Sequence, residues 1–254
     1  MESTGRVLRR RLTPAERDEK LKRKQTEKCE PDAAEVKRAR ILRPFIKYNG
    51  KVNYYTEMID IAMISDELLK KAESSTDLLI VGFDLEWPFS FVTGTERTAV
   101  AQISIDLKNC YILHVSKFKN LPKGLSEFLI HPNVRITGNN IKNDVRKLAR
   151  DFPGFDGDKM VENCIDLGVL ANSILPTKQR WSLEKLVNHL LNLRISKDKK
   201  IRNSSWNKIP LSTAQQKYAA LDAYASLLLY HTLKDKEKEL NVEKSQNDQN
   251  IMNK

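Results

Sequence analysis

The sequence is poor in cysteine and contains no long apolar run. Its three cysteines, Cys29, Cys110 and Cys164, are odd in number and far apart, which excludes a disulfide framework and a paired-cysteine metal site. This cysteine usage favours a reducing compartment. No apolar stretch reaches the roughly 20 residues that a membrane-spanning helix needs, and no signal-peptide pattern stands at the start. We therefore expect no membrane partner.

Motifs of nucleotide-driven motors are also missing. The pattern Gly-x-x-x-x-Gly-Lys-Ser/Thr, which cradles nucleotide phosphates, does not occur, and this excludes a P-loop ATPase or a helicase motor of that kind. No internal repeat is visible. What the sequence has in excess is positive charge, because 44 Lys and Arg stand against 33 Asp and Glu, a formal net charge of +11. Such an excess fits a polyanionic partner, either nucleic acid or an acidic membrane surface.

Residues 1–43 contain no aromatic residue and carry 14 Lys and Arg against 8 Asp and Glu. A segment with so little apolar surface to bury is predicted to be disordered on its own. Its basic clusters at 9–11, 20–24 and 37–40 indicate either nuclear import and nucleic-acid contact or a merely solvated tail. The highly charged segment 236–254 is predicted to be a second disordered tail.

Between these tails, residues 44–235 alternate strand-like and helix-like patterns. An Asn-Gly pair at 49–50 between alternating apolar residues predicts a β-hairpin over 45–55. Strands are expected at 78–83, 99–106, 109–115 and 134–138, a strand or helix start at 164–175, and helices at 121–131, 139–152, 180–191 and 211–233. Strands followed by strands mixed with helices predict a single α/β domain, with a mixed central sheet flanked by helices.

The most apolar strand ends in two acids. Residues 78–83 read as a buried strand, and Asp84 and Glu86 follow it one residue apart. Side chains alternate along a strand, so the two carboxylates point to one face and repel each other. A metal cation would reverse the sign of this interaction. The alternative for an isolated Asp-x-Glu is a strand end with two solvated acids.

Further carboxylates stand at two other places. Tyr218 and Asp222 are four residues apart among small and apolar neighbours, and therefore lie on one face of the last predicted helix. Ser212 and Gln215 form a capping box at the start of that helix. Asp144 follows a Gly-Asn-Asn loop at a strand end, in the first turns of a helix. Each position also has a plain structural interpretation: a buried Tyr–Asp pair, and an acid stabilised by a helix dipole.

Taken together, these acids form the order Asp-x-Glu, Asp, Tyr-x-x-x-Asp, and with their surroundings they resemble the DEDDy group of 3′–5′ exonucleases. This group has the ribonuclease H-like fold of ribonuclease D and of proofreading exonucleases. The closer resemblance is to the exonuclease domain of the Werner syndrome protein and to the stand-alone Werner-type exonucleases of insects. It covers about residues 45–233, in the segments FDLEWPFSF, GNNIKNDVRKLARDF, RWSLEKLVNHLL, KDKKIRNSSW and YAALDAY.

The resemblance implies a catalytic set of Asp84, Glu86, Asp144, Tyr218 and Asp222, without a departure at any of the five. It implies two Mg²⁺ ions, with Mn²⁺ as a substitute, and hard oxygen ligands suit both metals. Asp84 would bridge the ions, Glu86 and Asp222 would hold the ion nearer the nucleophile, and Asp144 would bind the other. The Tyr218 hydroxyl would orient the attacking water or help to deprotonate it.

Other residues fit a nucleic-acid substrate without fixing its place. Lys199, Lys200 and Arg202 surround Trp206, which indicates either phosphate-binding cations around a base-stacking ring or a solvated basic loop. Trp87, with Phe89 and Phe91, stands beside the acids, and each ring either stacks on the terminal nucleotide or packs in the core. Arg180 is predicted to contact phosphate, Trp181 to lie in the core and Asp166 to cap a helix.

Three hypotheses follow. The first is a metal-dependent 3′–5′ exonuclease that acts on single-stranded or 3′-recessed DNA, releases nucleoside 5′-monophosphates and serves replication, recombination or repair in the nucleus. The second is the same chemistry on RNA, as in ribonuclease D. The third is a non-catalytic nucleic-acid-binding adaptor. The intact acid set disfavours the adaptor, and the Werner-type resemblance alone favours DNA over RNA, because no residue visibly recognises a 2′-hydroxyl.

Overall fold

The computed structural model describes residues 40–252, except 91, 93 and 155, together with 13, 15 and 38. It divides the chain into two units, 1–43 and 44–254. The basic clusters predicted at 9–11 and 20–24 lie outside the described residues, as does Phe91. All elements named below belong to the second unit. In the part of the chain that the structure describes, no helix combines the length and the apolar character that a membrane span requires.

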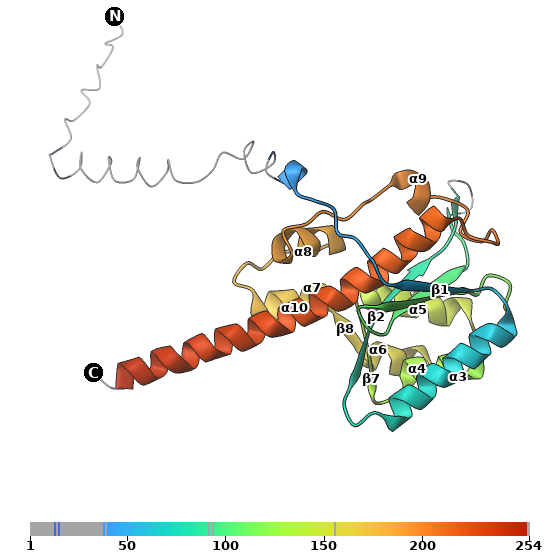
Figure 1. Cartoon of the computed structure of the whole chain (residues 1–254), viewed down its shortest axis with the longest axis horizontal. Coiled ribbons are helices and arrows are strands. Elements are labelled where there is room, and N and C mark those ends of the chain that lie inside the picture. The colour runs from blue at the N-terminus through green and yellow to red at the C-terminus, as the bar shows by residue number, and fades with distance from the viewer. Residues whose placement is uncertain are drawn as a thin grey trace, which may run out of the picture. The chain divides into compact units, whose positions relative to one another are not determined.

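A mixed sheet forms the centre of the domain (Figure 1). In the described residues it has six strands in the order β1-β6-β5-β2-β7-β8. Their bounds are Lys51–Tyr55 (β1), Leu79–Glu86 (β2), Val100–Ser104 (β5), Asn109–His114 (β6), Val134–Gly138 (β7) and Cys164–Asp166 (β8). Strand β5 runs antiparallel to both its neighbours, and the other pairs are parallel. Two short strands, β3 (Phe89–Ser90) and β4 (Gly94–Thr95), pair separately.

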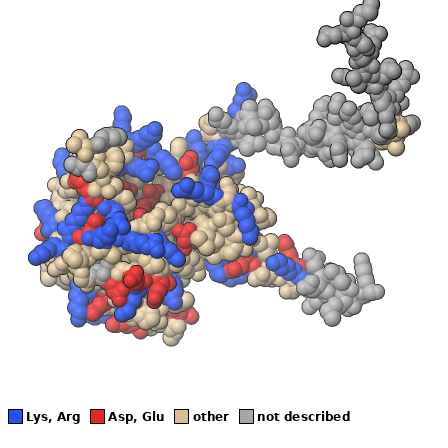
Figure 2. Space-filling view, turned by 180° about the vertical axis from the view of Figure 1, so that it is seen from behind, with Lys and Arg blue, Asp and Glu red and all other residues tan. Residues whose placement is uncertain are grey.

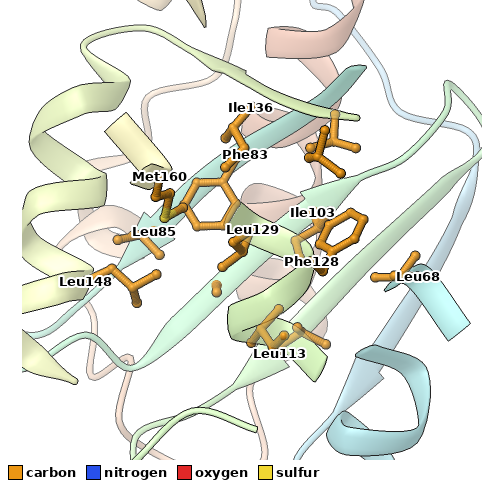
Figure 3. Close-up of a cluster of buried hydrophobic side chains, with 14 of the residues drawn as sticks. Leu68, Phe83, Leu85, Ile103, Leu113, Phe128, Leu129, Ile136, Leu148 and Met160 are labelled. Atoms are coloured by element: carbon orange, nitrogen blue, oxygen red, sulfur yellow. The ribbon is translucent and has the colours of Figure 1, made fainter. Parts of the chain in front are cut away.

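Helices cover both faces of the sheet, which confirms the predicted α/β class with a flanked mixed sheet. On one face lie α3 (Met58–Ser74), α4 (Lys123–Ile130), α5 (Ile141–Asp151) and α6 (Gly157–Glu162). On the other lie α7 (Leu167–Ile174), α8 (Leu183–Leu190), α9 (Lys199–Arg202) and α10 (Thr213–Met252). Figure 3 shows the core of the first face, where Phe83 and Leu85 of β2 meet Phe128, Leu129 and Leu148.

The alternation of β2 decides where its acids point. Phe83 and Leu85 are buried in the core beneath α4 and α5. Asp84 and Glu86 therefore emerge on the opposite face, which α10 covers. This confirms the prediction that the two carboxylates share a face.

Helix α10 crosses β2 at very close range. A Cβ atom added to Gly82 would lie 2.0 Å from the carbonyl oxygen of Ala223, so the strand and the helix touch backbone to backbone here. Ala219 and Ala220 continue the small surface of the helix. The predicted capping box begins α10, because the Ser212 and Gln215 side chains each bond the other residue's backbone N–H. Small residues and a defined start thus set the height of α10 above the sheet.

One predicted element is wrong, and one helix was not predicted. The hairpin predicted over 45–55 is wrong: β1 pairs in parallel with β6, while Ile46 and Pro44 bond the backbone of Arg194. Non-local pairing outweighs the local Asn-Gly signal here. Helix α3 was not predicted, although Ile61, Ile64, Leu68 and Ala72 bury one helical face. Residues 236–252 continue helix α10, and the disordered tail predicted over 236–254 stays a prediction. Side-chain pairs of Lys234 with Glu237 and of Asp235 with Lys238 accompany this polar stretch of α10.

Candidate active site

Five predicted residues from three elements line a single pocket of about 710 Å³. Asp84 and Glu86 come from the end of β2, Asp144 from the first turn of α5, and Tyr218 and Asp222 from consecutive turns of α10. Glycine and alanine contacts hold α10 against β2, and the parallel pairing of β2 with β7 brings α5 to the same end of the sheet. Residues up to 138 positions apart in the sequence thereby meet, since Asp222 and Asp84 face one another.

The acids form a compact cluster. Carboxylate oxygens of Asp84, Glu86 and Asp222 lie within 4.8 Å of one another. Asp144 stands outside this group of three but lines the same pocket, and the charge of Asp84 acts on it. Among the described residues, none of the four carboxylates is paired with a cation at salt-bridge distance. The cluster therefore has no described cation within salt-bridge distance to stabilise its ionised form.

Burial and mutual repulsion disfavour the ionised form of every acid in the cluster. Burial raises the pKa of Asp84 to about 6, and Arg202 counteracts part of this shift. Burial and the charges of Asp84 and Asp222 raise the pKa of Glu86 well above its ordinary value, and burial with the charge of Asp84 does the same for Asp222. Burial and the charge of Asp84 raise the pKa of Asp144 to about 8. Four partly buried acids without cationic partners are a costly arrangement that a bound cation relieves.

The donor set fits a hard divalent cation. Carboxylate oxygens are the ligands that Mg²⁺ and Mn²⁺ prefer. An ion with bonds of about 2.1 Å holds its ligand oxygens up to about 4 Å apart, so ångström-scale side-chain movements suffice to bring the three clustered carboxylates onto one ion. The cluster of Asp84, Glu86 and Asp222 is thus consistent with a divalent metal site.

The ring of Tyr218 packs at the edge of this cluster, while its hydroxyl makes no bond to a described residue that would stabilise the fold. The ring is half-buried and packs against Trp206, with the two ring centroids 6.1 Å apart. Its hydroxyl forms no hydrogen bond with another described residue. Burial, followed by the charge of Asp222, raises the pKa of the phenol, so the hydroxyl is protonated at neutral pH. A fixed ring with a free polar tip suits the orientation of a small molecule in the pocket.

The sequence matches the family model described as 3′–5′ exonuclease over residues 56–238. The chain belongs to the 3′–5′ exonuclease family. The match spans the elements from α3 into α10 and so includes every acid of the pocket. Members of this family are hydrolases, and an acid cluster that is consistent with a divalent metal site agrees with that chemistry.

Similar curated proteins come from fruit flies. Proteins named 3′–5′ exonuclease from Drosophila yakuba and Drosophila melanogaster are each 46% identical to this chain over 196 residues, which is 77% of this chain. A protein of the same name from Drosophila persimilis is 43% identical over 219 residues, or 85% of this chain. The matched regions cover 55%, 56% and 61% of these relatives, so the chain spans little more than half of their length.

Solved exonuclease structures share the fold at low sequence identity. The Aedes aegypti Nibbler EXO domain aligns with a TM-score of 0.62 at 17% identity, covering 77% of this chain and 94% of that domain. The catalytic core of RRP6 from Trypanosoma brucei aligns with a TM-score of 0.58 at 20% identity, covering 79% and 50%. Escherichia coli RNase D aligns with a TM-score of 0.57 at 15% identity, covering 74% and 46%. These neighbours confirm the expected ribonuclease H-like exonuclease fold.

The residues predicted to contact nucleic acid fall into separate groups. Trp87 and Arg202 line the acidic pocket, and Lys147 lies 4.8 Å from the centre of the Trp87 ring. Arg180 lines an adjoining groove that shares Asn139, Asn140 and Ser182 with the pocket. Lys199 and Lys200 are exposed on α9. Trp181 lies in the core and Asp166 caps α7, as predicted.

Trp206 was wrongly predicted to stack on a base. Its side chain is fully buried, and its indole N–H donates to the Arg202 carbonyl oxygen over 2.9 Å. The ring packs with Tyr218 and with Ala219 and Ala220 beneath α10, where a nucleotide has no access. The basic residues around Trp206 in the sequence suggested an exposed ring, but neighbouring charges do not determine the orientation of a side chain. Trp206 therefore stabilises the pocket by packing against Tyr218.

We therefore expect a Trp206→Phe variant to lose stability and keep its nucleic-acid affinity. The smaller ring leaves a cavity and an unpaired Arg202 carbonyl oxygen, which together cost about 1–3 kcal/mol in the free energy of unfolding. Denaturant unfolding and binding to a short single strand measure the two effects. A base-stacking Trp206 predicts the reverse: unchanged stability, and an affinity loss of about 1–3 kcal/mol.

Two features of the site were missed in the sequence. Asn139 and Asn140 line the pocket at the junction of β7 and α5, and Asn140 has the left-handed backbone that ends the strand sharply, with a φ of 62°. An Asn-Asn pair before a helix was the available signal. The second feature is a basic ridge of Lys142, Arg146 and Arg150, exposed at four-residue spacing on α5. Figure 2 shows that Lys and Arg gather on the side of the domain facing away from the viewer in Figure 1.

Proposed function

We propose that the protein is a metal-dependent 3′–5′ exonuclease that removes nucleotides from the 3′ end of DNA. The observation that carries this proposal is the pocket in which three carboxylates lie within 4.8 Å and which a fourth carboxylate and Tyr218 also line. In the proposed reaction, a water oxygen attacks the last phosphodiester phosphorus. The bond from phosphorus to the 3′ oxygen of the shortened strand breaks, and a nucleoside 5′-monophosphate leaves.

The acids are proposed as ligands of two Mg²⁺ ions, with Mn²⁺ as a substitute. Asp84, Glu86 and Asp222 would hold one ion, and Asp84 together with Asp144 would hold the other. When bound, the ions supply Lewis-acid stabilisation of the charge that develops on phosphate oxygens, and they lower the pKa of water. Carboxylates on a rigid strand end and on packed helices need little rearrangement to receive them.

Other side chains of the pocket have proposed roles toward the strand. The Tyr218 hydroxyl orients the attacking water, since it stands free beside Asp222 and Glu86. Arg202 lines the same pocket, and its positive charge acts on Asp84, Glu86 and Asp222, so it also suits a phosphate oxygen. Trp87 offers an aromatic surface to the terminal nucleotide at the pocket wall.

DNA is proposed over RNA because the motif segments resemble those of the Werner-type exonucleases. A place in nuclear replication, recombination or repair follows from the same resemblance, with the basic clusters of 1–43 as import signals. A degradation assay tests the substrate and the chemistry together. It compares single-stranded DNA, 3′-recessed DNA and RNA of one sequence, each with Mg²⁺, with Mn²⁺ and with chelator. Stepwise shortening of 3′-recessed DNA that chelator abolishes is expected, whereas a preference for RNA favours the ribonuclease D type.

The basic ridge of α5 is proposed to bind phosphates of the substrate upstream of the pocket. Helix α5 carries Asp144 in the pocket, and its exposed face carries Lys142, Arg146 and Arg150 over about 12 Å of helix length. No ion pair joins these three cations to a described acid. Cations that remain unpaired beside a nucleic-acid site neutralise phosphates and release counterions.

Replacing Lys142, Arg146 and Arg150 together with alanine is therefore expected to weaken binding to 3′-recessed DNA. The slope of log affinity against log salt concentration should become shallower by about 2–3, because about 0.7–0.9 counterions are released for each lost phosphate contact. The rate at saturating DNA should be unchanged. Alanine at Lys70, Lys71 and Lys123, on α3 and α4, is the control with the same change in charge. Equal losses in both variants would show a general charge effect instead of a binding ridge.

A further inference from the structure

Three buried side-chain atoms without partners gather behind Asp84. Gln102 and His114 are both fully buried in the sheet. Neither the amide oxygen nor the amide nitrogen of Gln102, nor Nε2 of His114, has a hydrogen-bond partner among the described residues. A buried polar group without a partner destabilises the folded state by about 1–3 kcal/mol. Three such atoms in one close-packed layer therefore require an explanation.

The strand register places Gln102 beside the acid. Gln102 of β5 lies directly opposite Asp84 of β2 in the antiparallel ladder. Directly opposite residues share one face of the sheet, with Cβ atoms about 5 Å apart. The face is the one beneath α10, because the neighbouring Ile112 packs with Ala219, Ala220 and Ala223. The register thus places the Gln102 amide beside the Asp84 carboxylate under α10, although the two form no hydrogen bond in this structure.

The same register places His114 next to Gln102. His114 of β6 lies opposite Val100, which makes it the diagonal neighbour of Gln102 on the same face. Diagonal pairs are within reach of long side chains. The Tyr54 hydroxyl accepts the backbone N–H of Leu211 over 3.0 Å and lies 2.9 Å from His114 Nδ1.

One tautomer completes this arrangement: the Tyr54 oxygen accepts from Leu211, and its O–H donates to Nδ1 of His114. The histidine is neutral at neutral pH, since burial and then the charge of Lys117 lower its pKa to about 4. In that tautomer the proton sits on Nε2, which is a buried donor, and the Gln102 amide oxygen is a buried acceptor on the same face.

We propose that Gln102 is a positioning residue for the metal site: when Asp84 binds a metal ion, the Gln102 amide N–H donates to the Asp84 oxygen that does not bind the metal, and His114 Nε2–H donates to the Gln102 amide oxygen, directly or through one water. The chain of donors then runs from Leu211, at the start of α10, through Tyr54, His114 and Gln102 to Asp84. Once Asp84 binds a cation, its remaining lone pairs face inward, and a fixed donor there sets the direction of the carboxylate. This inference rests on the proposed role of Asp84 as a metal ligand.

A Gln102→Met variant of the full chain separates positioning from packing. Methionine has a similar length and lacks the amide, so the metal-free protein should melt at the same temperature as the unaltered protein or higher. Its apparent affinity for Mn²⁺, measured by the rise of the melting temperature on titration, should fall about 10–100-fold, as should kcat on a short 3′-recessed DNA. Gln102→Leu is a second apolar replacement, of a different shape. Ile112→Met changes the same buried layer without touching an amide and should leave Mn²⁺ affinity unchanged.

A double-mutant cycle tests the link to the histidine. His114→Phe alone should weaken Mn²⁺ binding several-fold, and it should have no further effect once Gln102 is methionine, because it acts through the amide. An unaltered Mn²⁺ affinity in both Gln102 variants would overturn the proposal and leave the amide as a buried group served by water. If the unaltered protein itself shows neither Mn²⁺ stabilisation nor metal-dependent cleavage, the proposed function fails instead.

Discussion

An Asp84→Ala variant is expected to lose DNA cleavage by about 10³-fold or more and to remain folded. Asp84 stands at the centre of the acid cluster, since its charge acts on Glu86, Asp144 and Asp222 alike. Loss of the shared ligand removes metal-ion stabilisation worth several kcal/mol, and each 1.36 kcal/mol is tenfold in rate.

The thermal stability of the metal-free Asp84→Ala variant should not fall, although its activity does. Removing one negative charge relieves the repulsion among the buried acids, so the metal-free variant should melt no lower than the unaltered protein. Binding of a short DNA in the presence of chelator should persist. Asp84→Asn keeps the shape of the side chain and should be similarly inactive, and Asp158→Ala, an exposed acid on α6, should be fully active. Normal cleavage by a variant with alanine at both Asp84 and Glu86 would refute the proposed chemistry of this pocket.

A Tyr218→Phe variant is expected to slow the chemical step by about 10²–10⁴-fold while the fold stays intact. Loss of a group that orients a proton or a nucleophile typically has this magnitude. Phenylalanine keeps the ring that packs on Trp206 and removes only the hydroxyl. Because that hydroxyl bonds no other described residue, its loss should leave the melting temperature unchanged. Single-turnover rates and thermal melts of the same preparation measure the two effects.

Tyr48→Phe is the matched control for Tyr218→Phe. The Tyr48 hydroxyl donates to the Lys51 carbonyl oxygen over 2.9 Å, and Tyr48 does not line the acidic pocket. Its removal should cost about 0.5–1.5 kcal/mol in the free energy of unfolding and leave the rate unchanged. A Tyr218→Phe variant that behaves like this control, with a normal rate and a lowered melting temperature, would mean that another group orients the water.

Several features of the site were accessible in the sequence because they depend on local periodicity. The two-residue period of a strand places Asp84 and Glu86 on one face, and β2 has this arrangement. The helical spacing of Tyr218 and Asp222 carries both into the pocket. The Ser212–Gln215 box begins α10 as predicted, since a capping box is formed by residues three positions apart. Helix α3 has an equally local pattern of buried apolar residues, although it was not predicted.

Features that depend on a distant partner were not accessible in this way. The Asn-Gly pair before β1 predicted a hairpin, but β1 found its partner in β6, and nothing within 45–55 specifies that choice. Trp206 stands in a basic, polar stretch, yet it faces inward because α10 offers an alanine surface above it. In the sequence, Gln102 is one polar residue in an apolar strand. Only the strand register shows that it lies opposite Asp84.

The sequence by itself determined the acids, their facing directions within each element, the helix caps and the α/β class, because these follow from backbone geometry over a few residues. That Asp144 and Asp222 meet Asp84 was implied by the family resemblance, and only the tertiary structure showed how they meet. Tertiary structure alone decided that Trp206 lies beneath the pocket and that a ridge of cations lines α5 near it. The physical reason is that close contact of Gly82 with Ala223, and the pairing of β2 with β5 and β7, depend on shape and hydrogen bonding between distant segments. Such contacts form only when the whole sheet and its helices are in place.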